Sequence, residues 1–179
     1  MDRLFVAIPI DQSHRQGLAR ICTGLPGMRW TPDEQIHLTL RFIGQATDEQ
    51  TEAIAEALAR VSHPPFDLII QGCGVFPYDK SPRVLWAGAV ASDELMELEK
   101  KVNRALRRAG CKLSRQRFHP HITIGRPRKT PARLMARYLE SQALFTLPPM
   151  AVKKFCLYTS ILSPAGARHY LSAEFDLGG

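Results

Sequence analysis

The turn residues and the hydrophobic periodicity of this chain predict the same series of secondary-structure elements twice. In the first half, strands are expected at 4–10, 36–43 and 66–76, with helices at 12–22 and 48–61. In the second half, strands are expected at 84–90, 118–125, 150–162 and 168–176, with helices at 92–109 and 131–141. This repeated order indicates an internal duplication. We therefore expect two lobes related by a pseudo-two-fold axis.

The length of 179 residues suits one domain. We expect a single domain spanning 1–179, built from duplicated lobes at about 1–78 and 79–179, and the pattern leaves exchange of strands between the lobes open. Strands separated by helices, with polar alternation in the key strands, indicate an α+β fold. Each lobe would carry an antiparallel or mixed sheet with helices on the outside, and the lobes would flank a central cleft. A parallel α/β fold is the second choice.

Composition excludes several other classes of protein. With 45% hydrophobic and 23% charged residues, the chain matches a globular protein rather than a disordered or fibrous one. No stretch approaches the ~18 consecutive apolar residues of a membrane span, and the apolar run near the N-terminus is too short for a signal peptide. Four widely separated cysteines without a C-x-x-C pair indicate reduced thiols. The expected location is the cytoplasm, with no membrane partner.

The positive charge is concentrated in one segment. Residues 100–137 contain thirteen Lys or Arg and no Asp or Glu, whereas the remainder of the chain is net acidic. Such a field attracts polyanions, of which nucleic acid is the commonest in a cell. For residues 100–108, helical spacing favours a solvated helix face instead. That preference is weaker for the arginines beside the expected strand at 118–125.

The middle strand of each half contains the same short motif, HLTL from His37 and HITI from His121. Side chains alternate between the two faces of a strand, so His37 shares a face with Thr39, and His121 shares a face with Thr123. One such motif arises often by chance, but two on equivalent elements of a repeated unit do not. We expect the two strands to face each other across a shared cleft that contains two imidazoles and two hydroxyls.

Two histidines and two hydroxyls suit the cleavage of a phosphodiester. One imidazole can activate the attacking oxygen while the other protonates the leaving oxygen, because groups with a pKa near ~6.5 hold opposite protonation states at neutral pH. The hydroxyls can donate to the non-bridging oxygens, and a nearby Arg can neutralise the developing charge. The sequence lacks H-E-x-x-H, G-x-S-x-G and phosphate-binding-loop motifs, so no metal and no cofactor is expected.

Four segments resemble one known family. They are RLFVAI from Arg3, RWTPDEQIHLTLRFIG from Arg29, RFHPHITIGR from Arg117 and LYTS from Leu157. Together they span nearly the whole chain, which is identified as a member of the two-histidine phosphoesterases. Within that superfamily it is similar to the RNA 2′,3′-cyclic phosphodiesterases, also called 2′-5′ RNA ligases.

The resemblance implies metal-independent hydrolysis of a terminal RNA 2′,3′-cyclic phosphate to a 2′-phosphomonoester. His37 would be the general acid for O3′ and His121 the general base for water, although pseudo-symmetry leaves the exchange of these roles open. Thr39 and Thr123 would hold the phosphoryl oxygens. A 5′-hydroxyl in place of water would form a 2′-5′ linkage.

The implied partner is RNA with a cyclic phosphate end, tRNA fragments among the candidates, and the expected state is a monomer without an obligate protein partner. Two alternatives remain open. The same site would suit small cyclic nucleotide phosphates or 2′-5′ linked oligonucleotides. Alternatively, the chain would be a non-catalytic RNA-binding module in which the basic segment binds the backbone and the histidines are incidental.

Two arginines close to the motifs are candidates for phosphate binding. Arg126 stands where the family has a basic residue, but counting by two from His121 puts Gly125 on the cleft face instead. Gly125 would have to form a bulge or end the strand for Arg126 to reach the cleft. Arg41 has the right parity, on the face of His37, and a charge on the rim is the equal alternative.

Aromatic residues and the other histidines complete the set of candidates. Phe5 and Trp30 are candidates for stacking on a base, with core packing preferred for Phe5 and equally favoured for Trp30. Tyr158 lies in the segment that resembles the C-terminal hairpin of the family and is a candidate for the pocket. His119 shares a face with His121, and a structural role is preferred there over a metal ligand. The remaining histidines are expected at the surface: His14, His63 and His169.

Overall fold

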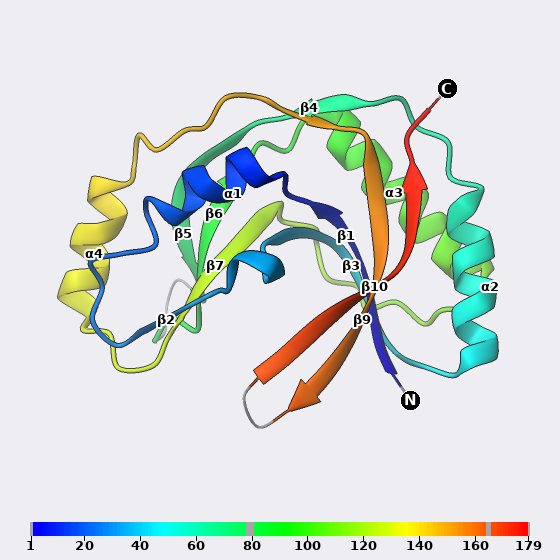
Figure 1. The fold of residues 1–179 in the computed structure, drawn as a ribbon, viewed down its shortest axis with the longest axis horizontal. Helices are drawn as coiled ribbons and strands as arrows, with labels where there is room; N and C mark the ends of the chain where they lie inside the picture. The colour runs from blue at the N-terminus through cyan, green and yellow to red at the C-terminus, as the bar shows by residue number, and fades with distance from the viewer. Residues whose placement is uncertain (1, 78–80, 164–165, 179) are drawn as a thin grey trace.

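The computed structural model describes residues 2–77, 81–163 and 166–178 (Figure 1). The helices are α1 (Gln12–Ala19), α2 (Asp48–Ala59), α3 (Asp93–Arg108) and α4 (Ala132–Ser141), with a short 3₁₀ helix η1 (Asp33–Gln35). The strands are β1 (Asp2–Pro9), β2 (Met28–Trp30), β3 (His37–Ala46), β4 (Phe66–Leu68), β5 (Ile70–Phe76), β6 (Val84–Ala89), β7 (His121–Pro127), β8 (Met150–Val152), β9 (Lys154–Ser163) and β10 (Gly166–Asp176). The expected lobe boundary at 78–79 lies outside the described residues.

The described strands form one large sheet and one small one. The large sheet has the order β10-β9-β1-β3-β7-β6-β5, with β2 also paired to β7, and the small sheet pairs β4 with β8. Every described strand pair is antiparallel. The α+β prediction is therefore confirmed, and the parallel α/β alternative is wrong. The expected separate sheets of two lobes are instead joined into one.

The large sheet narrows in its middle, where β3 meets β7 at the residue pair Leu38 and Ile122. Both side chains are fully buried. On one side of this seam lie β10, β9, β1 and β3, beside α2 and α3; on the other lie β7, β6, β5 and β2, beside α1 and α4 (Figure 1). We call these the β1 group and the β6 group.

Each group combines segments from both halves of the sequence. The C-terminal strands β9 and β10 extend the sheet from β1, and α3 packs against α2 and β3. In the opposite direction, β2 and β5 lie in the β6 group. The duplication, and with it an exchange of strands between duplicated lobes, stays a prediction.

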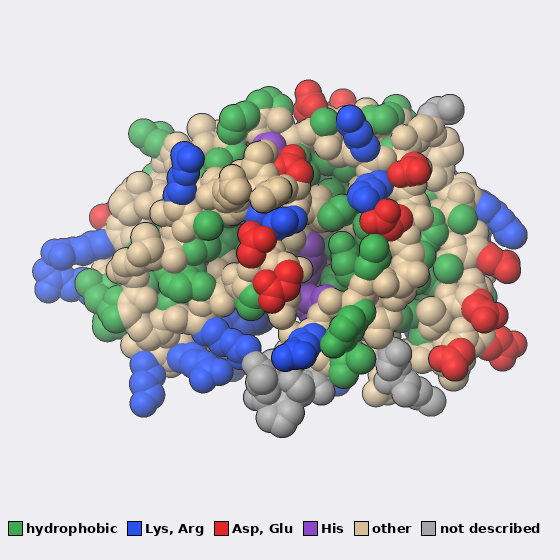
Figure 2. All heavy atoms as spheres, viewed as in Figure 1, with side chains coloured by type: hydrophobic (Ala, Val, Ile, Leu, Met, Phe, Trp, Pro, Cys, Tyr) green, Lys and Arg blue, Asp and Glu red, His purple; other side chains and the backbone are tan. Residues whose placement is uncertain are grey.

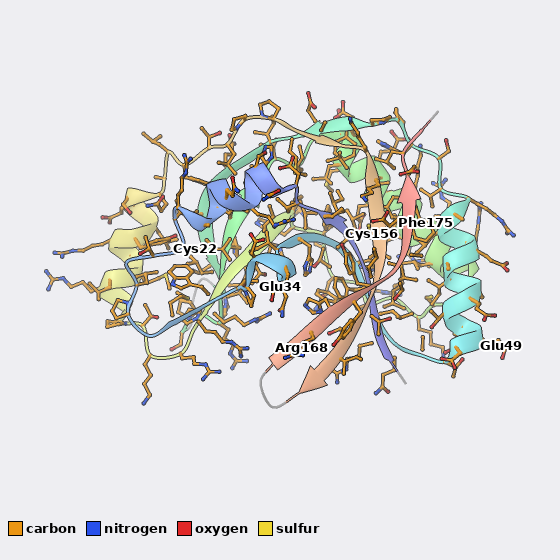
Figure 3. The ribbon with its side chains drawn as sticks, in the orientation of Figure 1. Cys22, Glu34, Glu49, Cys156, Arg168 and Phe175 are labelled. Carbon is orange, nitrogen blue, oxygen red and sulfur yellow. The ribbon has the colours of Figure 1, made fainter. Side chains whose placement is uncertain are left out.

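Local sequence signals explain where the long helices begin. The Thr47 side chain accepts from the Gln50 backbone and the Gln50 side chain accepts from the Thr47 backbone, a capping box that starts α2. The Ser92 hydroxyl caps α3 by accepting from the backbone N–H of Leu95. Helices α2 and α3 cover one face of the β1 group, and Figure 3 shows Phe175 of β10 on the side that faces them. No described helix is long and apolar enough to cross a membrane.

Two predicted strands are each divided between the two sheets. The expected strand 66–76 becomes β4 and β5, separated at Ile69, and the expected strand 150–162 becomes β8 and β9, separated at Lys153. The alternation of buried residues runs through the break at Ile69, so periodicity gives no sign of it, whereas two consecutive lysines, Lys153 and Lys154, interrupt the alternation at the second break. Strand β2 has only three residues, too few to show a period, and was not predicted.

Candidate active site

The seam between β3 and β7 brings the two HxT motifs together. Leu38 lies opposite Ile122 in antiparallel register. Extending this register by one residue in each direction places His37 opposite Thr123, and Thr39 opposite His121. Neighbours across a strand pair are about 5 Å apart and point to one face, here the face opposite to the buried Leu38 and Ile122. The two strands are therefore adjacent in one sheet, and the expectation that they face each other across a cleft is wrong.

These four side chains lie in a cavity of about 840 Å³. Figure 2 shows His side chains in the middle of the visible face, between the two ends of the molecule. Three candidates for substrate binding also line the cavity, namely Phe5, Trp30 and Arg126. Further lining residues were not predicted: Arg3, Arg29, Phe42 and His169. Because the described lining includes Arg but neither Asp nor Glu, the cavity suits an anion.

Each motif is followed by a register shift at the same place. In β3 the shift against β1 falls at Leu40, and in β7 the shift against β6 falls at Ile124, each three residues after the His. A bulge of one residue reverses the parity of the later residues in its strand. A register shift therefore lets Arg126 reach the cavity as expected, although it falls at Ile124 and Gly125 remains paired with Leu85. Phe42 takes the equivalent position in the first motif.

The same shift removes Arg41 from this cavity, so its expected place on the face of His37 is wrong. Arg41 is 8% exposed and does not line the cavity of the histidines. Its Nη2 donates to the backbone carbonyl of Ser114 over 2.6 Å. The guanidinium thus lies on the far side of the bulge, beside the loop that precedes β7.

Both motif imidazoles form a hydrogen bond with the backbone two residues before them in the chain. The Nδ1 of His121 lies 2.7 Å from the carbonyl oxygen of His119, and the imidazole of His37 bonds to the backbone of Gln35. Since a carbonyl oxygen only accepts, Nδ1 of His121 carries the proton, and Nε2 presents a lone pair. Each motif therefore anchors its imidazole two residues upstream.

Burial makes both imidazoles weaker bases than a free His. It lowers the pKa of His37 from 6.5 to about 4, with a smaller contribution from His169. Burial also lowers the pKa of His121. In both cases the apolar surroundings disfavour the charged ring. Without a bound anion, both rings are neutral at pH 7.

The predicted aromatic residues divide into those that line the cavity and those behind it. Phe5 is 2% exposed, with its ring centroid 4.9 Å from that of His37. Tyr158 stacks on Phe5 at 5.2 Å and is absent from the lining, so its predicted place in the pocket is wrong. Trp30 lies over Gly125, where an added Cβ would come within 3.1 Å of its ring.

The structure corrects the surface prediction for three histidines. His14 and His63 are buried, and His14 bonds Asp11 through Nδ1 at 2.7 Å and the Pro148 carbonyl through Nε2 at 2.9 Å. His169 lines the cavity, with its ring centroid 5.4 Å from that of His37. No sequence motif marks His169, because β10 reaches the site only through its pairing with β9.

Charge is distributed unevenly around the cavity. Figure 2 shows Lys and Arg at the lower left, near the β2 and β7 end of the molecule, and Asp and Glu at the lower right, over α2. The sequence around β7 accounts for the basic region, with Arg126, Arg128 and Lys129 in succession. A long polyanion that enters the cavity is attracted to the β6 group and repelled by α2.

Comparison with known proteins agrees with this geometry. A family model described as the 2′-5′ RNA ligase superfamily matches residues 13–161. A protein of Archaeoglobus fulgidus named RNA 2′,3′-cyclic phosphodiesterase is 34% identical, with 92% of this chain and 94% of that protein covered. A protein of the same name from Thermotoga maritima is 33% identical, covering 99% and 96%. The solved structure of E. coli LigT complexed with 3′-AMP has a TM-score of 0.77 at 26% identity, with 99% of each chain covered.

Proposed function

The chain belongs to the 2′-5′ RNA ligase superfamily, and from this we propose that it hydrolyses RNA 2′,3′-cyclic phosphate ends to 2′-phosphomonoesters. The observation that carries the proposal is the cluster formed across the seam by His37, His121, Thr39 and Thr123. Four such groups on one face match the needs of a phosphodiester that is cleaved by an acid and a base. The names of the relatives support RNA as the substrate.

In the proposed reaction, the cyclic phosphate lies between the imidazoles, and the Thr39 and Thr123 hydroxyls donate to its non-bridging oxygens. His121 accepts the proton of a water whose oxygen attacks phosphorus, and the P–O3′ bond breaks. His37 donates its proton to O3′, which leaves a 3′-hydroxyl and a 2′-phosphate. Arg126 contributes positive charge as negative charge develops on the phosphoryl group. Proton exchange with solvent then returns His121 to its neutral form and His37 to its charged form.

Protonation of the acid is coupled to substrate binding. A phosphate monoanion adjacent to a buried imidazole favours its charged form and raises its pKa. The pKa of about 4 for His37 belongs to the ligand-free cavity. Bound substrate therefore supplies the anion that lets one ring hold a proton near neutral pH.

The experiment that tests the function uses a short RNA with a 2′,3′-cyclic phosphate end, in excess EDTA. Conversion to the 2′-phosphate supports the reaction, its regiochemistry and its independence of metal. A cyclic mononucleotide and a 2′-5′ linked dinucleotide run in parallel test the small-substrate alternative. Salt-sensitive RNA binding without any product would favour the non-catalytic binding module.

Variants of the two histidines test the roles of those residues. His37→Gln and His121→Gln are each expected to lower kcat by roughly 10²- to 10⁴-fold, the usual contribution of a general acid or base. The double variant should lose little more than either single variant, because the two groups act as a unit. Thermal melts serve as the control for folding. A single variant with a normal melt and full activity would exclude the acid–base pair.

The proposal also covers ligation, the oligomeric state and the location of the protein in the cell. A 5′-hydroxyl RNA added in high concentration should yield a 2′-5′ linked product if it replaces water at His121. We propose a monomer without an obligate partner in the cytoplasm; sedimentation at micromolar concentration tests the monomer, and cell fractionation tests the location.

A further inference from the structure

A second cavity adjoins the one that holds the reacting groups. Its volume is about 360 Å³, within the range of about 300–1,000 Å³ that small ligands occupy. It shares three lining residues with the first cavity, namely Thr39, Phe42 and His121. A molecule in the second cavity therefore lies directly beside the phosphate site proposed above.

The positively charged part of this second cavity comes from arginine. Arg41 is 8% exposed, and its Nε has no hydrogen-bond partner. None of the ion pairs among the described residues includes Arg41. Removal of a cation from water costs several kcal/mol unless an opposite charge compensates it. Arg117 adds a second, exposed guanidinium to the lining, so an anion is the ligand that satisfies this site.

The apolar part of the cavity includes three phenylalanines. Phe42 is 67% exposed, an unusual position for a large apolar side chain, and Phe76 and Phe118 lie on other walls. Exposed aromatic rings provide surfaces on which unpaired bases stack. Phosphate-binding arginines beside aromatic rings match the two chemical parts of a nucleotide.

We propose that this second cavity binds a second ribonucleotide of the RNA, with its phosphate on Arg41 and Arg117 and its base on the phenylalanines. The proposal rests on the function proposed above. Two nucleotides share this chemistry: the one that precedes the cyclic end in the same RNA, and the first one of an RNA that brings a 5′-hydroxyl. His121 borders both cavities. A 5′-hydroxyl that arrives from the second cavity would therefore meet His121, the proposed general base.

The test compares the wild-type protein with Arg117→Gln and, as the matched control, Arg115→Gln. Both arginines are exposed residues of the same loop, but Arg115 does not line the second cavity. Arg117 is preferred to Arg41 because replacement of Arg41 would also remove the hydrogen bond to the Ser114 carbonyl. The control reports the effect of losing one positive charge from this loop.

The first measurement is the ratio of kcat/KM for a dinucleotide ending in a cyclic phosphate to kcat/KM for a cyclic mononucleotide. If the preceding nucleotide occupies the cavity, Arg117→Gln lowers this ratio about tenfold, as expected for one charge-assisted hydrogen bond. The second measurement is inhibition of cyclic mononucleotide hydrolysis by a dinucleoside monophosphate with a free 5′-hydroxyl. If the incoming nucleotide occupies the cavity, Arg117→Gln weakens that inhibition about tenfold instead.

Two results would overturn the second-nucleotide site. The first is that Arg117→Gln changes neither measurement. The second is that Arg115→Gln changes both measurements as much as Arg117→Gln does, which would attribute the effect to the positive charge of the loop as a whole. A wild-type protein that cleaves neither substrate would instead remove the proposed function, so the two failures are distinguishable.

Discussion

At the scale of single residues, the two copies of the HxT motif hold chemically different imidazoles. His37 lies beside Phe5 and His169, whereas His121 lies 5.1 Å from the ring of Phe76. Both have a pKa below 6.5, and that of His37 falls to about 4. An identical tetrapeptide form thus yields two different acids because the residues around it differ.

The lowered pKa values predict the pH dependence of the reaction. In the free protein one ring must be charged and the other neutral, and both pKa values lie below 6.5. The two limbs of kcat/KM report the two pKa values of the acid–base pair in the free protein. We expect a maximum in kcat/KM below pH 6.5, and a maximum in kcat at higher pH because bound phosphate raises the pKa values. Rate profiles from pH 4 to 9 would disprove this if kcat/KM rose continuously to pH 8.

Removal of either hydroxyl tests the proposed phosphate contacts. Thr39→Val and Thr123→Val keep the shape of the side chain but lose the hydrogen-bond donor. Each should lower kcat by about 10- to 100-fold, a smaller effect than the removal of a buried donor from an oxyanion hole. Thr→Ser at the same positions should retain most of the activity. Steady-state kinetics with both series distinguishes a lost donor from altered packing. Full activity in both Val variants would contradict the assignment.

At the scale of elements, the cavity depends on how short segments are fixed to the sheet. Strand β2 places Trp30 over the cavity, and the turn before β2 contains Gly27 with φ +72°. A Cβ at Gly27 would lie 2.6 Å from the backbone of Lys129, which belongs to the connection from β7 to α4. Two segments far apart in sequence are thus packed backbone to backbone at this glycine.

Replacement of this glycine should displace β2. Gly27→Ala combines an unfavourable positive φ with the clash, so we expect a loss of stability of more than about 1 kcal/mol and a higher KM. Gly24→Ala is the matched control, because Gly24 has φ +77° and open space around it. Chemical denaturation and KM measurements on both variants test this. Equal effects at the two positions would show that strain alone, and not the close approach, determines the outcome.

How far the sequence predicts the site depends on which elements stay regular. Alternation along a strand correctly placed His37, Thr39, His121 and Thr123, because the strands are regular at these residues. It failed at Arg41, because the bulge at Leu40 is fixed by pairing with β1 and leaves no mark in the local sequence. At Arg126 the conflict between parity and expected role already pointed to the bulge.

Long-range pairing explains the other failures. His169 and Tyr158 lie on neighbouring strands that follow β1 in space and not in sequence, so no local pattern tells which one faces the cavity. The helices, which form from local caps and a 3.6-residue period, were predicted within a few residues of their observed ends. Antiparallel order and the joining of the two groups into one sheet are properties of the whole chain.

At the scale of the whole molecule, the β6 group and α2 carry surface charge of opposite sign. Asp48 and Glu49 start α2, whereas basic residues follow the second motif along β7 (Figure 2). In the proposed function, an RNA longer than the cavity would therefore gain phosphate contacts on the β6 group. A mononucleotide, which ends inside the cavity, would not.

This asymmetry predicts that salt affects long and short substrates differently. Between about 50 and 200 mM salt, kcat/KM should fall much more steeply for an RNA of several nucleotides than for a cyclic mononucleotide. The double variant Arg128→Gln/Lys129→Gln should reduce the logarithmic salt slope for the longer RNA by about 1–2. The control, Arg107→Gln/Arg108→Gln at the end of α3, removes equal charge from the other group. Identical slopes for both substrates would contradict the prediction.

The paired bulges also bear on product identity. A site with two identical halves would accept a five-membered cyclic phosphate in either of two orientations, and would release a mixture of regioisomers. Equivalent positions after the bulges instead carry an aromatic ring, Phe42, and a guanidinium, Arg126. The two orientations of the cyclic phosphate are therefore not equivalent. A difference of about 1.4 kcal/mol in their free energies is enough to favour one orientation tenfold. In the proposed reaction, the two repeated motifs would supply the paired acid and base, and the difference between Phe42 and Arg126 would select one isomer.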